Sequence, residues 1–324
     1  MSKIILADFT HKKELINLWL EAFDDGENFV KSFLDAYMIP EYNVPVVVEE
    51  SGEISAALYL VDFELYSNTK LLGCCSYLFA AATKKEHRNK GYMSELIYYS
   101  EELCRNRGLK AIFLFPQNQK LFNFYSKTGF KTIYSAKKIT RNSKTTSENN
   151  LSDLKLVNKD ITDTKIFDNL YDSYVEFTAK QELSPMKDRL FYFKCASSYL
   201  NIPENSEIKA YFAVLENNVE KFCYVFYKKY KNTYYIDDII IPEYGNTEEN
   251  INKKDGKYNK TVELLSDFIL NLGNDINLEI TALPQNCTDG ENIPLAMILP
   301  LSDTVSDITD NLKSDVYINM FMNI

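Results

Sequence analysis

A basic turn with one glycine stands between an apolar stretch and a helical pattern in this 324-residue sequence. The turn and the start of the helix comprise Arg88, Asn89, Lys90, Gly91, Tyr92, Met93 and Ser94. A strand that leads through such a turn into a helix presents the free amides of the helix's first turn at the positive end of the helix dipole. Such amides bind a pyrophosphate, and a glycine lets the backbone come close to it. The alternative is a solvated basic turn.

A tyrosine in an aromatic segment is the candidate for acid catalysis. Tyr125 belongs to the segment FYSKTGF, residues 124–130. Asn118 lies seven residues before Tyr125. A tyrosine phenol can donate a proton as a general acid. The alternative is a core tyrosine packed between Phe122 and Phe124.

The elements that would position these residues follow from hydrophobic periodicity. Residues 71–83 and 109–116 are apolar and predict strands, and residues 92–108 between them predict an amphipathic helix. Five further elements are predicted upstream: a strand at 4–7, helices at 11–23 and 27–38, and a hairpin of strands at 44–49 and 54–65. The expected fold class is α/β, with a mixed sheet of the α+β kind.

The ordered set of motifs resembles the GCN5-related N-acetyltransferase (GNAT) superfamily over residues 4–141. The turn resembles that family's Arg/Gln-x-x-Gly-x-Gly/Ala signature, with Met93 in place of the last small residue, and residues 118–130 resemble its second motif. The resemblance implies the acetyltransferase fold. It also implies acetyl-CoA as co-substrate and direct transfer of an acetyl group to a primary amine, either of a small molecule or of a lysine.

The resemblance assigns cofactor contacts to residues 88–94, and it places Asn118 at the cofactor end. It pairs the backbone of Ala81, Ala82 and Thr83 with the pantetheine amides. A crowded sheet centre beneath a helix would explain consecutive alanines equally well. The long side chain of Met93 would crowd the diphosphate unless it points into the helix–sheet interface.

For catalysis the resemblance assigns the general acid to Tyr125. Some family members carry a glutamate base eleven residues before the signature's Arg/Gln, and this position is Tyr77, which is too weakly acidic for the task. The proton of the amine then leaves through water or through a carboxylate elsewhere. Asp24, Asp25 and Glu27 are candidates to line the acceptor mouth, or they form only a charged turn.

The second half repeats the order of elements of the first, and its periodicity predicts, among others, a helix at 257–272 and a last strand at 316–322. Its loop at the pyrophosphate position, residues 242–260, carries carboxylates and lacks the R-x-x-G-x-G pattern, and carboxylates repel a diphosphate. We therefore expect two tandem GNAT-like domains, the second one degenerate. The expected boundaries are 1–141 for the catalytic domain, 142–150 for a polar linker and 151–324 for the degenerate domain.

Tandem acetyltransferases with one working half include the enhanced-intracellular-survival type. In that type the terminal carboxylate acts as a base in the first domain, which implies a catalytic role for Ile324. A disordered terminus is the alternative, and this chain shows no counterpart of the lipid-carrier-like domain of that type.

Composition and charge limit the partners. The net charge is −10, of which residues 1–150 contribute +1 and residues 151–324 contribute −11. An acidic half disfavours nucleic acid and anionic membranes, and it suits a cationic amine, although acidic residues also serve solubility alone.

Cysteine and histidine usage narrows the chemistry. Six scattered cysteines and two histidines predict no metal site and no Ser-His or Cys-His nucleophile. The thiols suggest a reducing compartment, and no signal peptide or membrane span is apparent, so we expect a cytoplasmic protein. A homo-oligomer stays open. So do two other classes, a non-catalytic acyl-CoA-binding regulatory protein and a structural interaction module.

Overall fold

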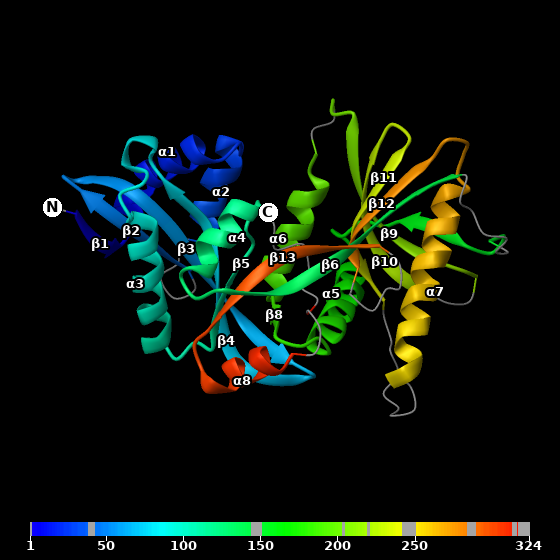
Figure 1. The fold of residues 1–324 in the computed structure, drawn as a ribbon. Helices are drawn as coiled ribbons and strands as arrows, with labels where there is room; N and C mark the ends of the chain where they lie inside the picture. Colours follow the sequence, from blue (N-terminus) through cyan, green and yellow to red (C-terminus); the bar gives the residue numbers. More distant parts are fainter. Residues whose placement is uncertain are drawn as a thin grey trace. The chain divides into compact units, whose positions relative to one another are not determined.

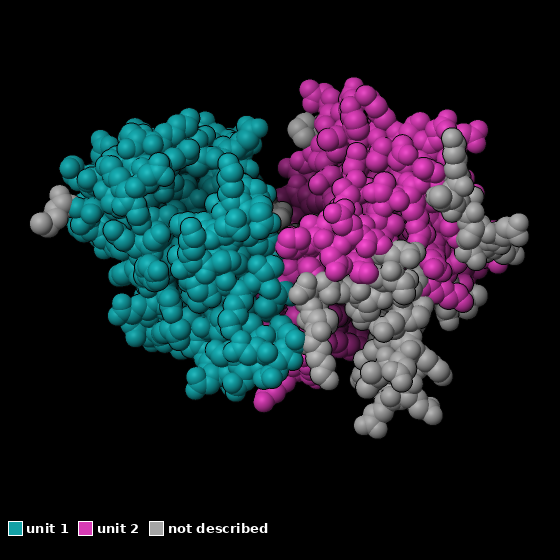
Figure 2. Space-filling view, viewed as in Figure 1, with its two compact units in different colours: residues 1–65, 72–133, 296–312 teal, residues 66–71, 134–295, 313–324 magenta. Residues whose placement is uncertain are grey.

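The computed structural model of the chain describes residues 2–37, 43–143, 151–202, 205–218, 221–241, 251–283, 290–312 and 316. The chain divides into two compact units (Figures 1 and 2). Unit 1 comprises Met1–Leu65, Leu72–Ile133 and Ala296–Leu312, and unit 2 comprises Tyr66–Leu71, Tyr134–Leu295 and Lys313–Ile324. The boundaries expected from the sequence stay a prediction, because they describe continuous segments, whereas the compact units exchange segments between the two halves.

Elements of the first half lie close to where hydrophobic periodicity predicts them. They are β1 (Ser2–Leu6), η1 (Phe9–His11), α1 (Lys12–Ala22), α2 (Glu27–Tyr37), β2 (Asn43–Glu50), β3 (Glu53–Ser67), β4 (Lys70–Thr83), η2 (Lys85–His87), α3 (Tyr92–Asn106), β5 (Ala111–Leu114), α4 (Gln119–Ser126) and β6 (Lys131–Asn142). The agreement has a local cause. In α3, for example, the buried positions Leu96, Ile97, Ser100 and Cys104 follow the helical period and place one face on the sheet.

The strands of unit 1 follow the order β1-β2-β3-β4-β5-β13. β4 and β5 are parallel, and such a pair requires a crossover, which α3 supplies. The last position belongs to β13 (Glu291–Pro300), which pairs antiparallel with β5 through Met297 and Leu114. A segment from the end of the chain therefore completes the sheet of the first unit.

Helices cover both faces of the unit 1 sheet (Figure 1). On one face Trp19 of α1 packs against Tyr59 of β3 and Phe79 of β4, with ring centroids 5.3 Å apart in both pairs. On the other face Leu58 and Leu78 join the core cluster that contains the buried side chains of α3. Neighbouring residues of a strand point to opposite faces, so β3 and β4 contribute to both cores.

The second half adds β7 (Lys155–Asn158), α5 (Thr164–Ala179), β8 (Ser184–Met186), α6 (Arg189–Leu200), β9 (Ile208–Glu216), β10 (Lys221–Tyr230), β11 (Thr233–Ile240), α7 (Ile251–Leu270), β12 (Asn277–Leu283), β13 and α8 (Asp303–Asn311). The sequence analysis did not predict the short strands β7 and β8. The predicted start of α7, residue 257, lies six residues after its observed start at Ile251. The expected last strand, 316–322, lies outside the described residues except for Val316.

Unit 2 repeats the strand pattern of unit 1. Its order β7-β9-β10-β11-β12-β6 again ends in a parallel pair, β11 and β12, followed by an antiparallel strand. That strand is β6, most of which belongs to unit 2 and which comes from the first half of the sequence. The tandem α/β architecture with mixed sheets, expected from the repeated element order, is confirmed.

Candidate active site

The turn between β4 and α3 has the shape of an anion site. Gly91 is the N-cap of α3 with φ 91°, and no side chain caps the helix there. A Cβ at Gly91 would meet nothing within 4 Å, so the glycine is needed for its left-handed conformation and not for space. Asn89 is also left-handed, with φ 64°. The first amides of α3 are thus left without a side-chain acceptor at the positive end of the helix dipole.

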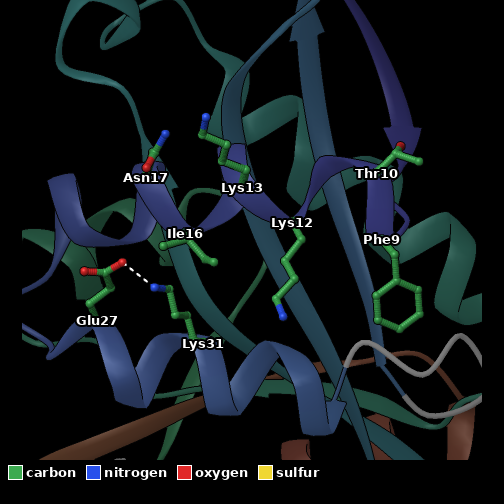
Figure 3. A pocket seen from close by; sticks show the side chains of 8 residues that line it. All are labelled: Phe9, Thr10, Lys12, Lys13, Ile16, Asn17, Glu27 and Lys31. Atoms are coloured by element: carbon green, nitrogen blue, oxygen red, sulfur yellow. Dashed lines mark ion pairs between the residues drawn. The ribbon is translucent and has the colours of Figure 1, made fainter.

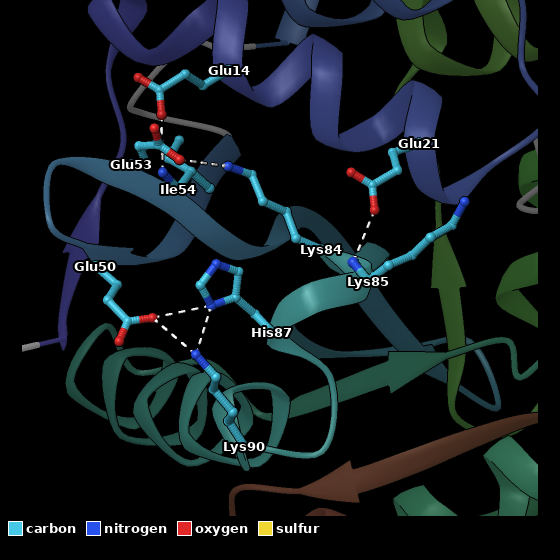
Figure 4. A network of polar contacts seen from close by, with 9 residues as sticks. All are labelled: Glu14, Glu21, Glu50, Glu53, Ile54, Lys84, Lys85, His87 and Lys90. Carbon is cyan, nitrogen blue, oxygen red and sulfur yellow. Dashed lines mark hydrogen bonds and ion pairs between the residues drawn. The ribbon is translucent and has the colours of Figure 1, made fainter.

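Two exposed cations precede these amides in the chain and each has a protein partner, of which Figure 4 shows that of Lys90. The Nε of Arg88 donates to the carbonyl oxygen of Thr83 at 3.2 Å. The Nζ of Lys90 lies 3.4 Å from Oε2 of Glu50 and 3.0 Å from Nδ1 of His87. Both cations are therefore held close to the turn in the absence of any ligand.

Groups from other elements contact Lys84 and Lys85, which precede the turn (Figure 4). The amide of Lys85 donates to Oε1 of Glu21 on α1 at 2.9 Å, and the amide of Lys84 donates to the carbonyl of Ser55 at 3.0 Å. Oε2 of Glu53 accepts from Nζ of Lys84 at 3.2 Å. Sequence reasoning missed Glu21, Glu50 and Glu53, because they lie 31 to 64 residues away from the lysines that they contact and carry no motif.

β4 separates from β5 before the turn. The two strands pair at Ser76–Ile112 and Tyr77–Phe113, and β4 continues to Thr83 beyond the end of β5 at Leu114. Ala80 interrupts the regular strand with φ 46°. The segment after this irregularity comprises the predicted pantetheine contacts Ala81, Ala82 and Thr83.

The alanine segment fits both readings that the sequence left open. Ala81 is half-buried and packs against the core cluster beneath α3, and Ala82 is 6% exposed. Small side chains are therefore needed for packing there. The same segment lies beyond the last β4–β5 pair, where another extended chain can approach the strand.

The first residues of α3 place their side chains away from the helix end. Met93 is half-buried and packs against the core cluster beneath α3. Its side chain therefore does not crowd the helix end, and its amide stays available to a diphosphate. Tyr92 is 7% exposed, and its hydroxyl hydrogen-bonds to Glu50. Ser94 is half-buried.

Tyr125 and Asn118 both lie on α4. Tyr125 is 7% exposed and packs against Phe124 and Phe130, with ring centroids 5.1 and 5.7 Å away. No described residue hydrogen-bonds to its hydroxyl, and burial raises the pKa of this phenol to about 12. Asn118 is the N-cap of α4 and accepts from the amide of Leu121 at 3.2 Å. Its side-chain carbonyl is therefore occupied by the helix.

Tyr77 lies within the aromatic core. It is 5% exposed and stacks on Phe113 with ring centroids 5.1 Å apart and planes inclined by 7°. This packing gives Tyr77 a structural role in the core.

The carboxylates between α1 and α2 have structural partners. Oδ2 of Asp25 accepts from the indole nitrogen of Trp19 at 2.7 Å, and Glu27 pairs with Lys31 at 2.6 Å. Glu27 does line a pocket of about 460 Å³ between the two helices (Figure 3). The other residues that line it are Phe9, Thr10, Lys12, Lys13, Ile16, Asn17 and Lys31. Of the three candidate carboxylates only Glu27 lines this pocket, together with three lysines.

Some predicted features cannot be placed. Ile324 and residues 242–250 of the second-half loop lie outside the described residues. Within the described part, no group of three or more His, Cys, Asp or Glu side chains is arranged to hold a metal. No helix among the described residues is long and apolar enough to cross a membrane. Of the described cysteines, Cys75, Cys104, Cys195 and Cys223 are buried and Cys74 is exposed.

Comparison with known proteins agrees with this geometry. The family model of the acetyltransferase (GNAT) domain matches residues 4–133. A comparison with curated proteins finds no match.

Solved structures share the fold across both units. A probable N-acyltransferase from Enterococcus faecalis V583 aligns with 92% of this chain and 72% of its own length, at 13% identity and a TM-score of 0.70. A GCN5-related N-acetyltransferase from Anabaena variabilis aligns with 93% of this chain and 73% of its own, at 13% identity and a TM-score of 0.68. Eis1 from Mycobacterium abscessus aligns with 93% of this chain and 74% of its own length, at 11% identity and a TM-score of 0.65.

Proposed function

We propose that the protein transfers the acetyl group of acetyl-CoA directly to a primary amine. The premise is that residues 4–133 belong to the GNAT acetyltransferase superfamily and that the chain has the tandem form of that fold. The observation that carries the proposal is the N-terminus of α3, which has no side-chain cap and comes directly after Arg88, Lys90 and the left-handed Gly91. Such a terminus offers both amides and cations to a diphosphate.

Each cofactor residue has a role in the proposal. The amides of residues 89–94 and the cations of Arg88 and Lys90 hold the diphosphate. The backbone of residues 81–83 pairs with the pantetheine arm, and the amide nitrogen of Asn118 donates at the cofactor end.

Acyl transfer then needs one nucleophile and one acid. The neutral amine attacks the thioester carbonyl carbon, the carbon–sulfur bond breaks, and the CoA thiolate takes the proton of Tyr125. The proton that the nitrogen loses passes to water or to a carboxylate elsewhere, since Tyr77 is packed in the core, and the phenolate of Tyr125 then takes up a proton from water. A phenol with a pKa of about 12 is fully protonated at neutral pH and is thus ready as an acid.

The acceptor is proposed from charge alone. Residues 151–324 carry a net charge of −11, which favours a cationic amine such as a polyamine, an aminoglycoside or a lysine side chain. The terminal carboxylate of Ile324 is retained as a candidate base, in analogy to the enhanced-intracellular-survival type.

Calorimetric titration with acetyl-CoA tests the proposal. We expect micromolar binding by the wild type and a loss of about a hundredfold in Arg88→Glu, which replaces a phosphate contact by a repulsive charge. Lys165→Glu is the matched control, because it reverses a charge at the N-terminus of α5, which Asp163 already caps. No binding by the wild type at millimolar cofactor would refute the proposal, and equal losses in both variants would refute the assignment of the site.

The rival is a regulatory protein that binds acyl-CoA without turnover. The aromatic packing of Tyr77, at the position where some family members have a base, favours it. Release of free thiol from acetyl-CoA in a screen of primary amines separates the two, because the regulatory protein would bind the cofactor and release none.

A further inference from the structure

Four side chains form a polar cluster at the turn between β4 and α3, and Figure 4 shows three of them, Glu50, His87 and Lys90. The Glu50 cluster consists of Glu50 at the end of β2, His87 at the end of η2, Lys90 in the turn and Tyr92 at the start of α3. Oε2 of Glu50 lies 3.0 Å from Nδ1 of His87 and 3.4 Å from Nζ of Lys90. Glu50 also hydrogen-bonds to the hydroxyl of Tyr92. One carboxylate thus contacts three side chains spread over residues 87–92.

The turn between these contacts has a conformation that needs support. Asn89 and Gly91 are both left-handed, with φ 64° and 91°. A left-handed conformation is unfavourable for a non-glycine residue, and no side chain caps α3 to fix the entry of the chain. Contacts from outside the turn must therefore hold residues 88–91 in the shape that directs the helix amides outward.

We propose that Glu50 is the positioning residue of the cofactor site, which holds the turn and the ammonium group of Lys90 in place for the diphosphate. The inference rests on the proposed function. Glu50 itself does not bind the cofactor. Lys90 offsets the negative charge of Glu50, and the Glu50 carboxylate also contacts His87 and Tyr92. Glu50 therefore does not repel the phosphates from the amides. These hydrogen bonds, first of all that from Tyr92, lower the pKa of Glu50, and the carboxylate stays ionised at neutral pH.

The same hairpin supplies a matched control residue. Glu53 is the first residue of β3 and pairs with Nζ of Lys84 at 3.2 Å. This pair also joins the hairpin to the segment after β4, but it does not reach residues 87–92. Glu53→Gln therefore removes the same charge from the same hairpin and leaves the turn intact.

The test compares Glu50→Gln with Glu53→Gln by calorimetric titration with acetyl-CoA. Losing the charge-assisted contacts of Glu50 should weaken acetyl-CoA binding by about tenfold, while Glu53→Gln should bind like the wild type. Ligand-observed NMR with S-acetylpantetheine, which has no diphosphate, should give the same affinity for all three proteins. A merely structural role would lower the affinities for both ligands together.

A double-mutant cycle with Lys90→Met gives the second readout. If Glu50 acts through Lys90, the loss from Glu50→Gln should shrink well below tenfold in the Lys90→Met background, because the two residues share one interaction. Unchanged or tighter acetyl-CoA binding by Glu50→Gln alone would overturn the inference, and so would a parallel loss of S-acetylpantetheine. If the wild type itself binds no acetyl-CoA, the proposed function is refuted. If the wild type binds and Glu50→Gln binds equally well, only the inference about Glu50 is refuted.

Discussion

The hydroxyl of Tyr125 has no described hydrogen-bond partner, although its ring is packed between Phe124 and Phe130. A core tyrosine usually satisfies its hydroxyl with a protein acceptor, so a free hydroxyl at this position is consistent with a substrate partner. Burial is the cause of the raised pKa, since the ionised phenolate would lose its hydration.

Tyr125→Phe tests the role of this hydroxyl. We expect kcat for thiol release to fall by about a hundredfold or more, with the calorimetric Kd for acetyl-CoA unchanged, because only the proton donor is removed. Tyr99→Phe on α3, which packs on the same core cluster, is the control and should keep full activity. Full activity in Tyr125→Phe would exclude it as the acid.

The pH profile of the same enzyme gives an independent check on Tyr125. Raising the pH removes an acid catalyst only as the pH approaches its pKa, here about 12. The wild-type kcat should therefore show no alkaline loss due to Tyr125 between about pH 7 and pH 10. An alkaline limb near pH 9 that disappears in Tyr125→Phe would contradict the raised pKa.

At the scale of elements, the end of β4 depends on one strained residue. Ala80 adopts φ 46° inside the strand, in a region that favours glycine, and β4 leaves its pairing with β5 just before it. This irregularity redirects residues 81–83 and thereby opens the strand end that is proposed to accept the pantetheine arm.

Substitutions at Ala80 should separate conformation from packing. Ala80→Val should lower the free energy of unfolding by about 2 kcal/mol, because a β-branched residue is poorly tolerated at positive φ. Ala80→Gly relieves the strain and should cost nothing, whereas Ala82→Gly, without positive φ, should cost about 0.5–1 kcal/mol. Urea unfolding measures all three, and an equal cost for both glycine variants would show that the conformation at Ala80 carries no strain.

At the scale of the whole molecule, unit 1 is not a continuous stretch of chain. Ala296–Leu312 belongs to it, and β13 pairs with β5 there. Nη1 of Arg105 on α3 donates to the carbonyl of Leu301 at 2.8 Å, and Leu299 lies in the core cluster beneath α3. The unit that holds the candidate active site therefore requires residues from the end of the sequence.

A fragment of residues 1–141 should not fold on its own. Without β13 it leaves one edge of β5 unpaired and the apolar surface beneath α3 incomplete. We expect that this fragment shows no cooperative urea transition and does not bind acetyl-CoA. Co-expression of residues 290–312 should restore the cooperative transition and the binding. A fragment that unfolds in one sharp transition and binds acetyl-CoA without this segment would contradict the exchange.

The sequence by itself determined the features that depend on neighbours along the chain. The helical period of α3, the glycine at its N-cap and the order of strands and helices are local, since a helix is built from contacts three or four residues apart. The diphosphate turn and Tyr125 were predicted for the same reason, because each lies within a short motif.

Only the tertiary structure decided which distant segments meet. Strand partners carry no label in the sequence, so the pairing of β13 with β5 across almost 200 residues could not be predicted from either segment. The contact of Glu50 with Lys90 depends on where β2 ends relative to α3, over a separation of 40 residues. Hydrophobic periodicity shows that a face is buried but not what buries it, and for this reason the supporting residues of the site and the composition of the two units became visible only in the fold.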